Sequence, residues 1–537
     1  MSGSNLRLLD CTLRDGGYYN SWDFSPDLIS QYIDAMLSAG VDIVEIGFRS
    51  LNNRGFRGAS AFTTDDFLES LNIPKDLMVG VMVNGSDLTN ASCLESALFN
   101  LFPKDSARSP VDLVRIACHV EDLRDALPAS VWLKKCGFLV GFNVMQITDY
   151  SADEIRDIAR LVLDYPLDVL YFADSTGSMN PDNVSRIIKY LRSNWDGDIG
   201  IHTHDNMGLA LSNTLCGLEQ GVTWVDSTVT GMGRGPGNAR TEELVIEIAE
   251  LRGQQINIIP LMGLLRKHFK PMQTKYGWGS NPYYYLSGKY GIHPSFVQEM
   301  LGDSRYTEVD LMSVIDYLRK KGGKKFCPQI LTNARNFYSA QPVGHWSPKS
   351  HFLGKDVLLL GSGLGVAKYR DALERFIKKN SPLVLALNTQ SSMDSHLIDF
   401  RVACHPLRLL ADCAIHNTLP QPLITPYSML PLDVQESLGD KKIFDFGITV
   451  KDSTFSFEDN YCTVPAPLVI GYALAIATSG GSSNILLAGF DGYGSDDPRT
   501  LEMHQLFEHY QSSKSSLPIV AVTPSCYKIP SQSIYAL

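Results

Sequence analysis

The stretch RLLDCTLRDGGYYN at residues 7–20 places a charged pair, Arg14 and Asp15, directly after a short apolar run. Eight such runs, each followed by a segment with helical spacing, fill the first half of the chain. They lie at residues 6–9, 43–48, 77–82, 113–117, 138–145, 169–172, 199–202 and 223–227. Their continuous apolar character is typical of parallel strands that are covered on both faces. Eight strand–helix units in about 250 residues predict a TIM barrel of the α/β class.

The composition is that of a globular protein with several domains. A length of 537 residues predicts two or three domains, and 44% hydrophobic with 20% charged residues excludes a disordered chain. No apolar run reaches the roughly 18 residues of a membrane span, and no signal peptide is evident, so we expect a cytoplasmic protein without membrane insertion. The net charge of -11 argues against nucleic acid as a partner. Ten scattered cysteines without a CxxC pair predict reduced thiols.

Changes of rhythm along the chain predict three regions. Residues 1–254 form the expected barrel domain. Residues 255–345 contain helix-like and aromatic segments and predict a helical lid or communication segment, with a linker within 327–354. Residues 355–537 return to the strand–helix rhythm, which predicts a Rossmann-like domain with an open parallel sheet.

Two histidines and an aspartate predict a metal site at one end of the barrel. In GIHTHDNMG (200–208) the period of two puts His202 and His204 on one face at the carboxyl end of a strand, where TIM barrels place their chemistry. Together with Asp15 they suit Mn²⁺ best, with Co²⁺, Zn²⁺ or Mg²⁺ as alternatives. Asn238 is the candidate fourth ligand. A lone histidine is usually a core residue and an Arg–Asp pair usually lies at the surface, but their convergence favours a site.

Three blocks make a family resemblance specific: LLDCTLRDGG (8–17), IHTHDNMG (201–208) and GMGRGPGNARTEE (231–243). They resemble the motifs of the pyruvate-carboxylase-type and hydroxymethylglutaryl-CoA-lyase-like metal-dependent TIM barrels, which include 4-hydroxy-2-oxovalerate aldolase and isopropylmalate synthase. The resemblance covers about residues 5–290 and is strongest to the aldolases. It implies Asp15, His202 and His204 as metal ligands and Arg14 as the cation beside an enolate oxygen.

The chemistry that suits these residues is carbon–carbon bond cleavage or formation next to a 2-oxo acid. Such a reaction passes through an enolate, whose charge a divalent ion and a fixed guanidinium can stabilise. The sequence therefore predicts a carbon–carbon lyase, a pyruvate aldolase that forms or cleaves a 4-hydroxy-2-oxo acid. Its partners are a small 2-oxo acid and an aldehyde, in a pathway to a 2-oxo-3-deoxy sugar acid for surface polysaccharide.

The general base is the point at which the chain departs from the aldolases. They carry a histidine three residues after the metal-binding aspartate, whereas this chain has Tyr18 there. A phenol ionises only at alkaline pH, so Tyr18 needs help from the metal or Arg14, or a water acts instead, or the ring simply packs. Tyr283 aligns loosely with a family tyrosine that orients the substrate, and packing is again the alternative.

Other polar residues at strand ends are candidates for substrate contact. Glu45, Asp174 and Ser175 are expected to position the substrate, although a buried ion pair explains Glu45 equally well. Asn143 and Gln146, at the end of the fifth run, are weaker candidates.

The C-terminal region begins with a glycine-rich turn, LLLGSGLGVAKYR (358–370). Gly361, Gly363 and Gly365 stand between a strand and a helix, as in phosphate-binding turns, although Val366 breaks the GxGxxG spacing. The next strand ends in Asn388 instead of an acidic residue, so ordinary dinucleotide binding is not expected.

A faint resemblance of about residues 355–527 to nucleotide-handling domains of bacterial sialyltransferases and of the hydroxymethylpterin-pyrophosphokinase-like group implies a nucleotide or nucleotide-sugar ligand. It rests on the glycine turn, on Asn388 and on the block GYALAIATSGGSSNILLAGFDGYG (471–494). Asp491 and His405 are further candidates, with a turn and a helix start as their structural explanations.

Two alternatives to the aldolase remain open at this point. One is a Claisen-type lyase or synthase that uses an acyl-CoA. The other is a non-catalytic scaffold whose barrel binds metal but lacks its base, which the substitution at Tyr18 favours. As TIM barrels of this family commonly pair, we expect a homo-oligomer.

Overall fold

The computed structural model describes residues 6–52, 55–302, 308–320, 341–493 and 497–537. The chain forms two compact units, one built around a closed barrel and the other around an open sheet. None of the helices in these ranges combines the length and the apolar character that crossing a bilayer requires.

Eight parallel strands close into a barrel in chain order, with the eighth strand paired to the first. They are β1 (Arg7–Asp10), β2 (Ile43–Phe48), β3 (Met78–Asn84), β4 (Leu113–Cys118), β5 (Leu139–Val144), β6 (Val169–Ala173), β7 (Asp198–His202) and β8 (Trp224–Ser227). Each strand falls on one of the eight apolar runs, so the predicted TIM barrel is confirmed.

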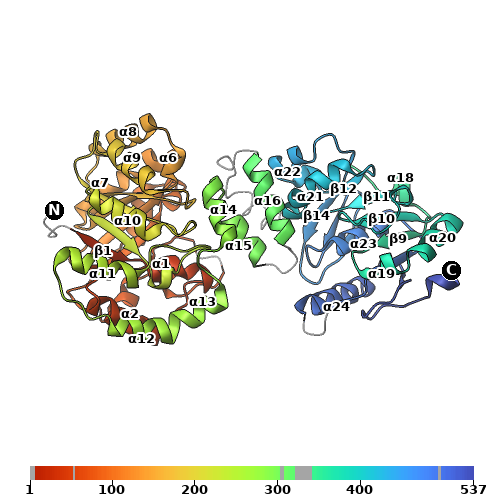
Figure 1. The fold of residues 1–537 in the computed structure, drawn as a ribbon, viewed down its shortest axis with the longest axis horizontal. Helices are drawn as coiled ribbons and strands as arrows, with labels where there is room; N and C mark the ends of the chain where they lie inside the picture. The colour runs from red at the N-terminus through yellow and green to blue at the C-terminus, as the bar shows by residue number, and fades with distance from the viewer. Residues whose placement is uncertain (1–5, 53–54, 303–307, 321–340, 494–496) are drawn as a thin grey trace. The chain divides into compact units, whose positions relative to one another are not determined.

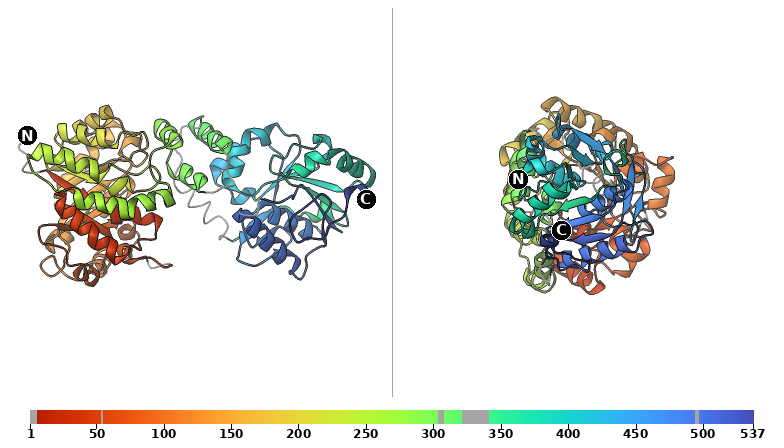
Figure 2. Two further views of the ribbon diagram at one scale, coloured as in Figure 1. Left: turned by 60° about the horizontal axis from the view of Figure 1, so that its bottom comes forward. Right: turned by 90° about the vertical axis from the view of Figure 1, so that its right-hand side faces the viewer.

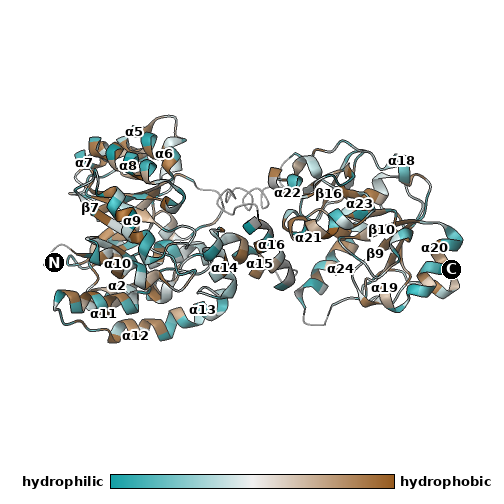
Figure 3. Cartoon of the chain, turned by 45° about the horizontal axis from the view of Figure 1, so that its top comes forward, coloured by the Kyte–Doolittle hydropathy of each residue, from teal (hydrophilic) through white to brown (hydrophobic). Residues whose placement is uncertain are grey.

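Helices connect the strands on the outside of the barrel (Figure 1). They are α2 (Pro26–Ser38), α3 (Asp65–Ser70), α4 (Gly85–Thr89), α5 (Leu94–Leu101), α6 (Val120–Ala126), α7 (Pro128–Lys135), α8 (Ala152–Leu161), α9 (Pro181–Leu191), α10 (Ala210–Glu219) and α11 (Thr241–Arg252). Helix α9 shows why they form: Asn180 caps its first turn, and Val184, Ile188 and Leu191 repeat on the buried side. Figure 3 shows such mixed faces on the outer helices.

Side chains alternate across each strand between the outer helices and the barrel interior. On β2, Val44 and Ile46 pack in the core beneath the helices, whereas Ile43 and Glu45 point inward. The interior is therefore apolar near the amino ends of the strands and ionic toward the carboxyl ends, where Glu45 meets Arg115 of β4. The ionic layer lies directly beneath the candidate site.

After the barrel the described residues are mainly helical, as expected from the loss of strand signals. The helices are α12 (Ile259–Leu264), a π-helical turn (Leu265–Phe269), α13 (Lys270–Tyr276), α14 (Pro282–Tyr290), α15 (Ser295–Leu301) and α16 (Glu308–Lys320). Residues 327–340 of the expected linker lie outside the described residues, and α18 (Lys349–Phe352) precedes the second unit's sheet.

The second unit contains a seven-stranded parallel sheet in the order β13-β12-β11-β10-β9-β17-β18. Its strands are β9 (Val357–Leu360), β10 (Leu383–Leu387), β11 (Phe400–Val402), β12 (Leu423–Thr425), β13 (Ile443–Asp445), β17 (Ile485–Ala488) and β18 (Ile519–Ala521). The predicted open parallel sheet is confirmed, with β9 in the place where the strand order reverses direction.

Helices cover both faces of this sheet (Figure 2). Val357 and Leu359 of β9 belong to one hydrophobic core, and Leu358 and Leu360 belong to the other, which explains the continuous apolar run. The helices are α19 (Leu364–Lys368), α20 (Arg370–Asn380), α21 (Pro406–Thr418), α22 (Leu432–Ser437), α23 (Val469–Ser479) and α24 (Pro498–Gln511). A small mixed sheet of β14 (Gly447–Val450), β16 (Tyr461–Val464) and β15 (Ser456–Phe457) was not expected from the sequence.

Candidate functional site

Arg14 and Asp15 lie on a single helical turn, α1 (Thr12–Asp15), at the carboxyl end of β1. The turn is fixed by Asp10, whose carboxylate accepts hydrogen bonds from the Thr12 backbone N–H (2.8 Å) and from the hydroxyl of Thr241 (2.5 Å). Arg14 and Asp15 are both buried, and Arg14 Nη1 donates to Asp15 Oδ1 at 2.9 Å. The local fold therefore holds a buried ion pair at the mouth of the barrel.

His202 and His204 both present Nε2 to this ion pair, because Nδ1 of each ring is occupied. His202 Nδ1 lies 2.9 Å from Asp226 Oδ2, and His204 Nδ1 lies 2.5 Å from the Asp174 carbonyl oxygen. Both partners can only accept, so Nδ1 carries the proton and Nε2 keeps its lone pair. Such a hydrogen bond behind the ring is the usual support of a metal-binding histidine.

Asn238 reaches the same place from the glycine-rich loop after β8. The loop turns back on itself because Gly231 and Gly237 have φ of 68° and 79°, and a Cβ on Gly237 would lie 2.0 Å from the Gly231 carbonyl oxygen. Asn238 pairs with His204 through the backbone, and its Nδ2 donates to Asp15 Oδ2 at 2.5 Å. Its Oδ1 is buried and makes no hydrogen bond within the described chain.

These four residues fit a divalent ion. Asp15, His202 and His204 each offer one ligand atom, and the three atoms lie within 4.8 Å of one another. The unpartnered Oδ1 of Asn238 supplies a further oxygen beside them. One carboxylate, two imidazoles and an amide oxygen form a donor set typical of Mn²⁺, Co²⁺ or Zn²⁺.

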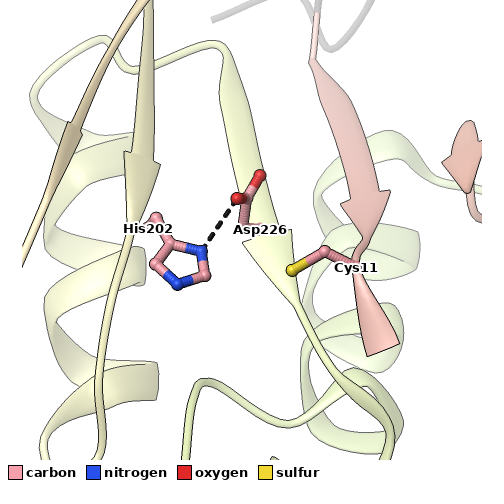
Figure 4. Close-up of side chains that lie close together, drawn as sticks. All are labelled: Cys11, His202 and Asp226. Carbon is pink, nitrogen blue, oxygen red and sulfur yellow. Dashed lines mark hydrogen bonds and ion pairs between the residues drawn. The ribbon is translucent and has the colours of Figure 1, made fainter. Parts of the chain in front are cut away.

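A second group, Cys11, His202 and Asp226, is close enough to hold an ion but is chemically less suited (Figure 4). Burial raises the pKa of the Cys11 thiol well above its usual value, which disfavours the thiolate that a metal needs. Asp226 already accepts from His202, as the dashed line in Figure 4 marks, and from Arg115. This group therefore supports the imidazole instead of forming a site of its own.

Asp226 and Arg115 are functional residues that the sequence reasoning missed. Arg115 is completely buried and donates to both oxygens of Glu45 (2.8 Å each) and to Asp226 Oδ2 (2.7 Å). Glu45 Oε2 also accepts from Arg14 Nε at 2.8 Å. The signal was present in the sequence: three of the apolar runs, IVEIGF, LVRIAC and WVDS, each carry one charged residue in an inward register.

Mutual compensation keeps these buried groups charged. Burial alone would raise the pKa of Asp15, but the positive charge of Arg14 brings it below its ordinary value. In the same way, burial opposes ionisation of Glu45, and Arg115 and Arg14 lower its pKa overall. Two arginines and three carboxylates, with Asp226, leave one net negative charge beneath the site. A divalent cation would reverse that sign.

The aromatic candidates are Tyr18, next to α1, and Tyr283 on α14. Tyr18 is 38% exposed, and its ring contacts Trp22 (centroids 4.8 Å apart) and lies 4.3 Å beneath the guanidinium of Arg234. Tyr283 is half-buried on α14, whereas its neighbour Tyr284 is buried against Gly235 of the loop after β8.

Tyr19 was not singled out in the sequence, although it lies beside the same loop. Its phenol oxygen accepts a hydrogen bond from the Gly235 N–H, and its ring stacks on Tyr276.

Most of the remaining residues that we predicted to contact the substrate form hydrogen bonds within the protein. Burial raises the pKa of Asp174 to about 7, while its carboxylate accepts from the backbone N–H groups of Ser178 and Met179. Ser175 Oγ accepts from the Gln146 N–H at 3.2 Å. Asn143 differs, since its buried Oδ1 makes no hydrogen bond within the described chain.

In the second unit, the glycine turn after β9 packs against the loop after β17. A Cβ on Gly361 or Gly363 would lie 2.6 or 2.5 Å from the Gly489 carbonyl oxygen. The Gly365 N–H donates to Asp491 Oδ2 at 2.7 Å, and Asp491 Oδ1 is buried without a hydrogen bond in the described part of the chain.

Two other candidates lie beside the sheet. Asn388 follows β10 with φ of 50°, and its carbonyl oxygen accepts from the buried Arg401. His405 is the N-cap residue of α21.

Replacing Asp226 by asparagine tests the support of His202. We expect Asp226→Asn to lower Mn²⁺ affinity about 10- to 100-fold, because His202 loses the carboxylate that orients it. We also expect about 3 kcal/mol less free energy of unfolding, because Arg115 loses a buried partner. Calorimetric metal titration and urea unfolding measure the two effects.

The matched control is Asp168→Asn, which weakens a half-buried ion pair with Lys134 (2.8 Å) before β6, at the amino end of the barrel. Its stability loss should not exceed about 1 kcal/mol, with unchanged Mn²⁺ binding. Unchanged Mn²⁺ affinity in Asp226→Asn would contradict the proposed support.

Comparisons with known proteins agree with the geometry of the barrel. Residues 5–262 match the family model described as HMGL-like. A 4-hydroxy-2-oxovalerate aldolase of Pelotomaculum thermopropionicum is 31% identical over 258 residues, 47% of this chain and 72% of that protein. An oxaloacetate decarboxylase of Mycobacterium tuberculosis is 24% identical, over 44% of this chain and 68% of that protein.

Among solved structures, that of the N-terminal domain of a candidate aldolase from Bacteroides vulgatus is 30% identical and covers 56% of this chain and 98% of that one, with a TM-score of 0.49. The family match ends before the second unit, whose sheet begins at β9. The chain belongs to the HMGL-like family and is an enzyme of the carbon–carbon lyase class.

Proposed function

We propose that the barrel is a divalent-metal-dependent pyruvate aldolase that forms or cleaves a 4-hydroxy-2-oxo acid. The observation that carries this proposal is the hydrogen bonding of the Arg14 guanidinium. Its Nε and Nη1 are held by Glu45 and Asp15, while its Nη2 is buried and makes no hydrogen bond within the described chain. A rigid guanidinium with one free donor beside a metal-binding group suits an oxygen that gains negative charge.

Asp15, His202 and His204 would hold the ion, with Asn238 Oδ1 as the fourth ligand. Mn²⁺ is our first choice, since imidazole and carboxylate both suit it, and Mg²⁺, Co²⁺ and Zn²⁺ are alternatives. When bound, the ion supplies a Lewis acid for the 2-oxo group of the substrate. The names of the aldolase and decarboxylase relatives support a 2-oxo acid as the substrate.

The chain's own residues would then have separate roles in binding and orienting the substrate. Arg14 Nη2 donates to the 2-oxo oxygen as the enolate develops, and Asp15 and Glu45 keep the guanidinium from turning away. Asp174 and Ser175 act as positioning residues, because Asp174 fixes His204 and Ser175 fixes the loop after β5. The buried acceptor Asn143 Oδ1 is free to orient the substrate.

A proton must also leave or reach the 4-hydroxyl of the aldol, and we propose Tyr18 for this transfer. Tyr18 is partly exposed beside α1, in the position of the aldolase histidine. Its ring packs edge-on against Trp22 and Phe48, so the hydroxyl has a defined direction. Tyr283 stays our candidate for orienting the substrate, and its neighbour Tyr284 is buried against Gly235 of the loop after β8.

The acceptor that we propose is a sugar-derived aldehyde, which would place the reaction in the formation or breakdown of a 2-oxo-3-deoxy sugar acid for surface polysaccharide. For the second unit we propose a nucleotide or nucleotide-sugar ligand at the carboxyl ends of β9, β10 and β17. Support comes from the reversal of strand order at β9 and from Asp491, whose free Oδ1 can accept a sugar hydroxyl. Gly361, Gly363 and Gly365 would shape this edge, with Asn388 beside it.

Exchange of the pyruvate methyl protons with deuterium tests the proposed aldolase without knowledge of the aldehyde. We expect exchange with added Mn²⁺, its loss on chelation, and its loss in His202→Ala, because enolate formation depends on the ion. NMR of pyruvate after removal of Mn²⁺ measures it. The control His268→Ala changes a histidine that contacts Gln31 outside the barrel and should leave exchange intact.

If no divalent ion supports exchange, the proposal that pyruvate is the donor is overturned, and an acyl-CoA donor or a scaffold is favoured. Both alternatives would still bind Mn²⁺ through His202, so deuterium exchange of the acetyl-CoA methyl protons in the same samples separates them, because a scaffold would catalyse none.

Tyr18→Phe tests the proton transfer. The variant keeps the ring beneath Arg234 and removes only the hydroxyl. We expect kcat/KM for cleavage of 4-hydroxy-2-oxovalerate to fall about 100-fold or more, with Mn²⁺ affinity unchanged. Pyruvate release measures the rate. Full activity would show that a water transfers the proton and that Tyr18 only packs.

Asp491→Asn tests the ligand of the second unit. The full chain should bind CMP or UDP, alone or sugar-linked, and Asp491→Asn should weaken binding roughly 10- to 100-fold, the worth of a hydrogen bond to a charged group. Calorimetric titration measures this, and Asp459→Asn, an exposed residue paired with Lys349, is the control. If Asp491→Asn and the wild type bind the nucleotide with equal affinity, Asp491 does not contact the ligand.

A further inference from the structure

Arg234 is a cation at the edge of the metal-binding group that the proposed aldolase chemistry does not use. It lies in the glycine-rich loop after β8 and is exposed. Within the described residues it forms no ion pair, and its guanidinium lies over the ring of Tyr18. By contrast Arg240, a few residues further along, pairs with Glu243 at 2.8 Å.

The neighbours of Arg234 in the loop fix where it stands. A Cβ on Gly233 would lie 2.6 Å from Asn238 Nδ2 and 3.1 Å from Asp15 Oδ2, so the backbone touches the metal-binding group at that point. On the other side, Gly235 has φ of 58° and packs against the ring of Tyr284. Arg234 therefore starts directly at the metal-binding group, between it and α14.

The side chain of Arg234 is oriented by Tyr18. The guanidinium carbon lies 4.3 Å from the centroid of the phenol ring, a cation–π distance. Stacking uses the face of a guanidinium and leaves its N–H groups free at the edge. The two residues thus hold a planar set of donors ready for an anion.

The groups around Arg234 do not supply that anion. Asp15 is engaged by Arg14 and Asn238, and Asp205 lies 3.9 Å from Arg240. His293, which the Arg234 charge reaches, is neutral at physiological pH, because burial first and Arg234 second lower its pKa to about 4. An exposed cation beside a site that becomes positive with a divalent ion attracts a second negative charge.

We propose that Arg234 selects an aldehyde acceptor that carries an anionic group, a carboxylate or a phosphate, away from its reacting carbon. This inference rests on the proposed aldolase function and adds the class of the acceptor. The proposed pyruvate donor uses the metal-binding group and Arg14, so the guanidinium on Tyr18 is left for the other substrate. Its planar donors match both carboxylate and phosphate oxygens.

Two pairs of aldehydes test the inference, each pair containing a neutral and an anionic member. They are propanal with succinic semialdehyde, and glyceraldehyde with glyceraldehyde 3-phosphate. The wild type should prefer the anionic member of at least one pair in kcat/KM for condensation with pyruvate, and the preferred pair identifies carboxylate or phosphate. Inhibition of pyruvate deuterium exchange by each aldehyde reports binding where turnover is slow.

Arg234→Gln should lower kcat/KM or inhibitory binding of the anionic aldehyde roughly 10- to 100-fold, the worth of a hydrogen bond between charged groups. In the same variant, kcat/KM for the neutral aldehyde and the rate of pyruvate exchange should change by no more than about twofold. Arg240→Gln removes an arginine that is already paired and should preserve the preference.

The outcomes separate this inference from the function on which it rests. The inference alone is overturned if the wild type exchanges pyruvate protons but does not prefer the anionic aldehyde of either pair. It is also overturned if Arg234→Gln lowers kcat/KM equally for both members of a pair while exchange persists. A higher KM for pyruvate in Arg234→Gln with unchanged aldehyde preference also overturns it, because the arginine would then serve the donor. A wild type without pyruvate exchange overturns the proposed aldolase and this inference with it.

Discussion

The candidate site depends on one buried contact, that of Arg115 with Glu45 and Asp226 inside the barrel. All three side chains are inaccessible or nearly so, and removing any one of them would leave an unpaired charge at a cost of about 3–5 kcal/mol. Replacing any one of the three residues therefore disrupts the whole cluster. Through Asp226 it orients His202, and through Glu45 it fixes Arg14, so the proposed metal ligand and the proposed catalytic cation depend on the same contacts.

Space for this cluster comes from glycines on neighbouring strands. A Cβ on Gly141 of β5 would lie 3.3 Å from the Arg115 side chain, and a Cβ on Gly200 of β7 would lie 2.5 Å from the ring of Tyr171. Tyr171 in turn lies against the Arg115 guanidinium, 4.6 Å from ring centroid to carbon. A large arginine fits within a small barrel because two strands give up side chains beside it, which couples the packing of the interior to its electrostatics.

The sequence contained most of the barrel and part of the site. Continuous apolar runs located all eight strands. The period of two predicted His202 and His204 on one face, and the structure brings both imidazoles beside Asp15. Asp226 escaped notice because its importance lies in a contact with Arg115, 111 residues away in the chain. Strands such as β11 (Phe400–Val402) are three residues long, too short for a periodic signal. Likewise, the glycines after β9 resembled a phosphate turn, but close approach of the loop after β17 also requires them.

The inner cluster and the outer rim of the barrel respond differently to substitution. Inside, a change at Arg115 alters stability, the orientation of His202 and the hold on Arg14 together, because one set of contacts serves all three. At the rim, Tyr18 and Arg234 contact each other across partly exposed surface and touch nothing in the buried cluster. The proposed chemistry at the 2-oxo group is thus tied to folding, whereas the proposed choice of acceptor is not. Variants at the rim can therefore report on substrate recognition with the metal site intact, which variants of the inner cluster cannot do.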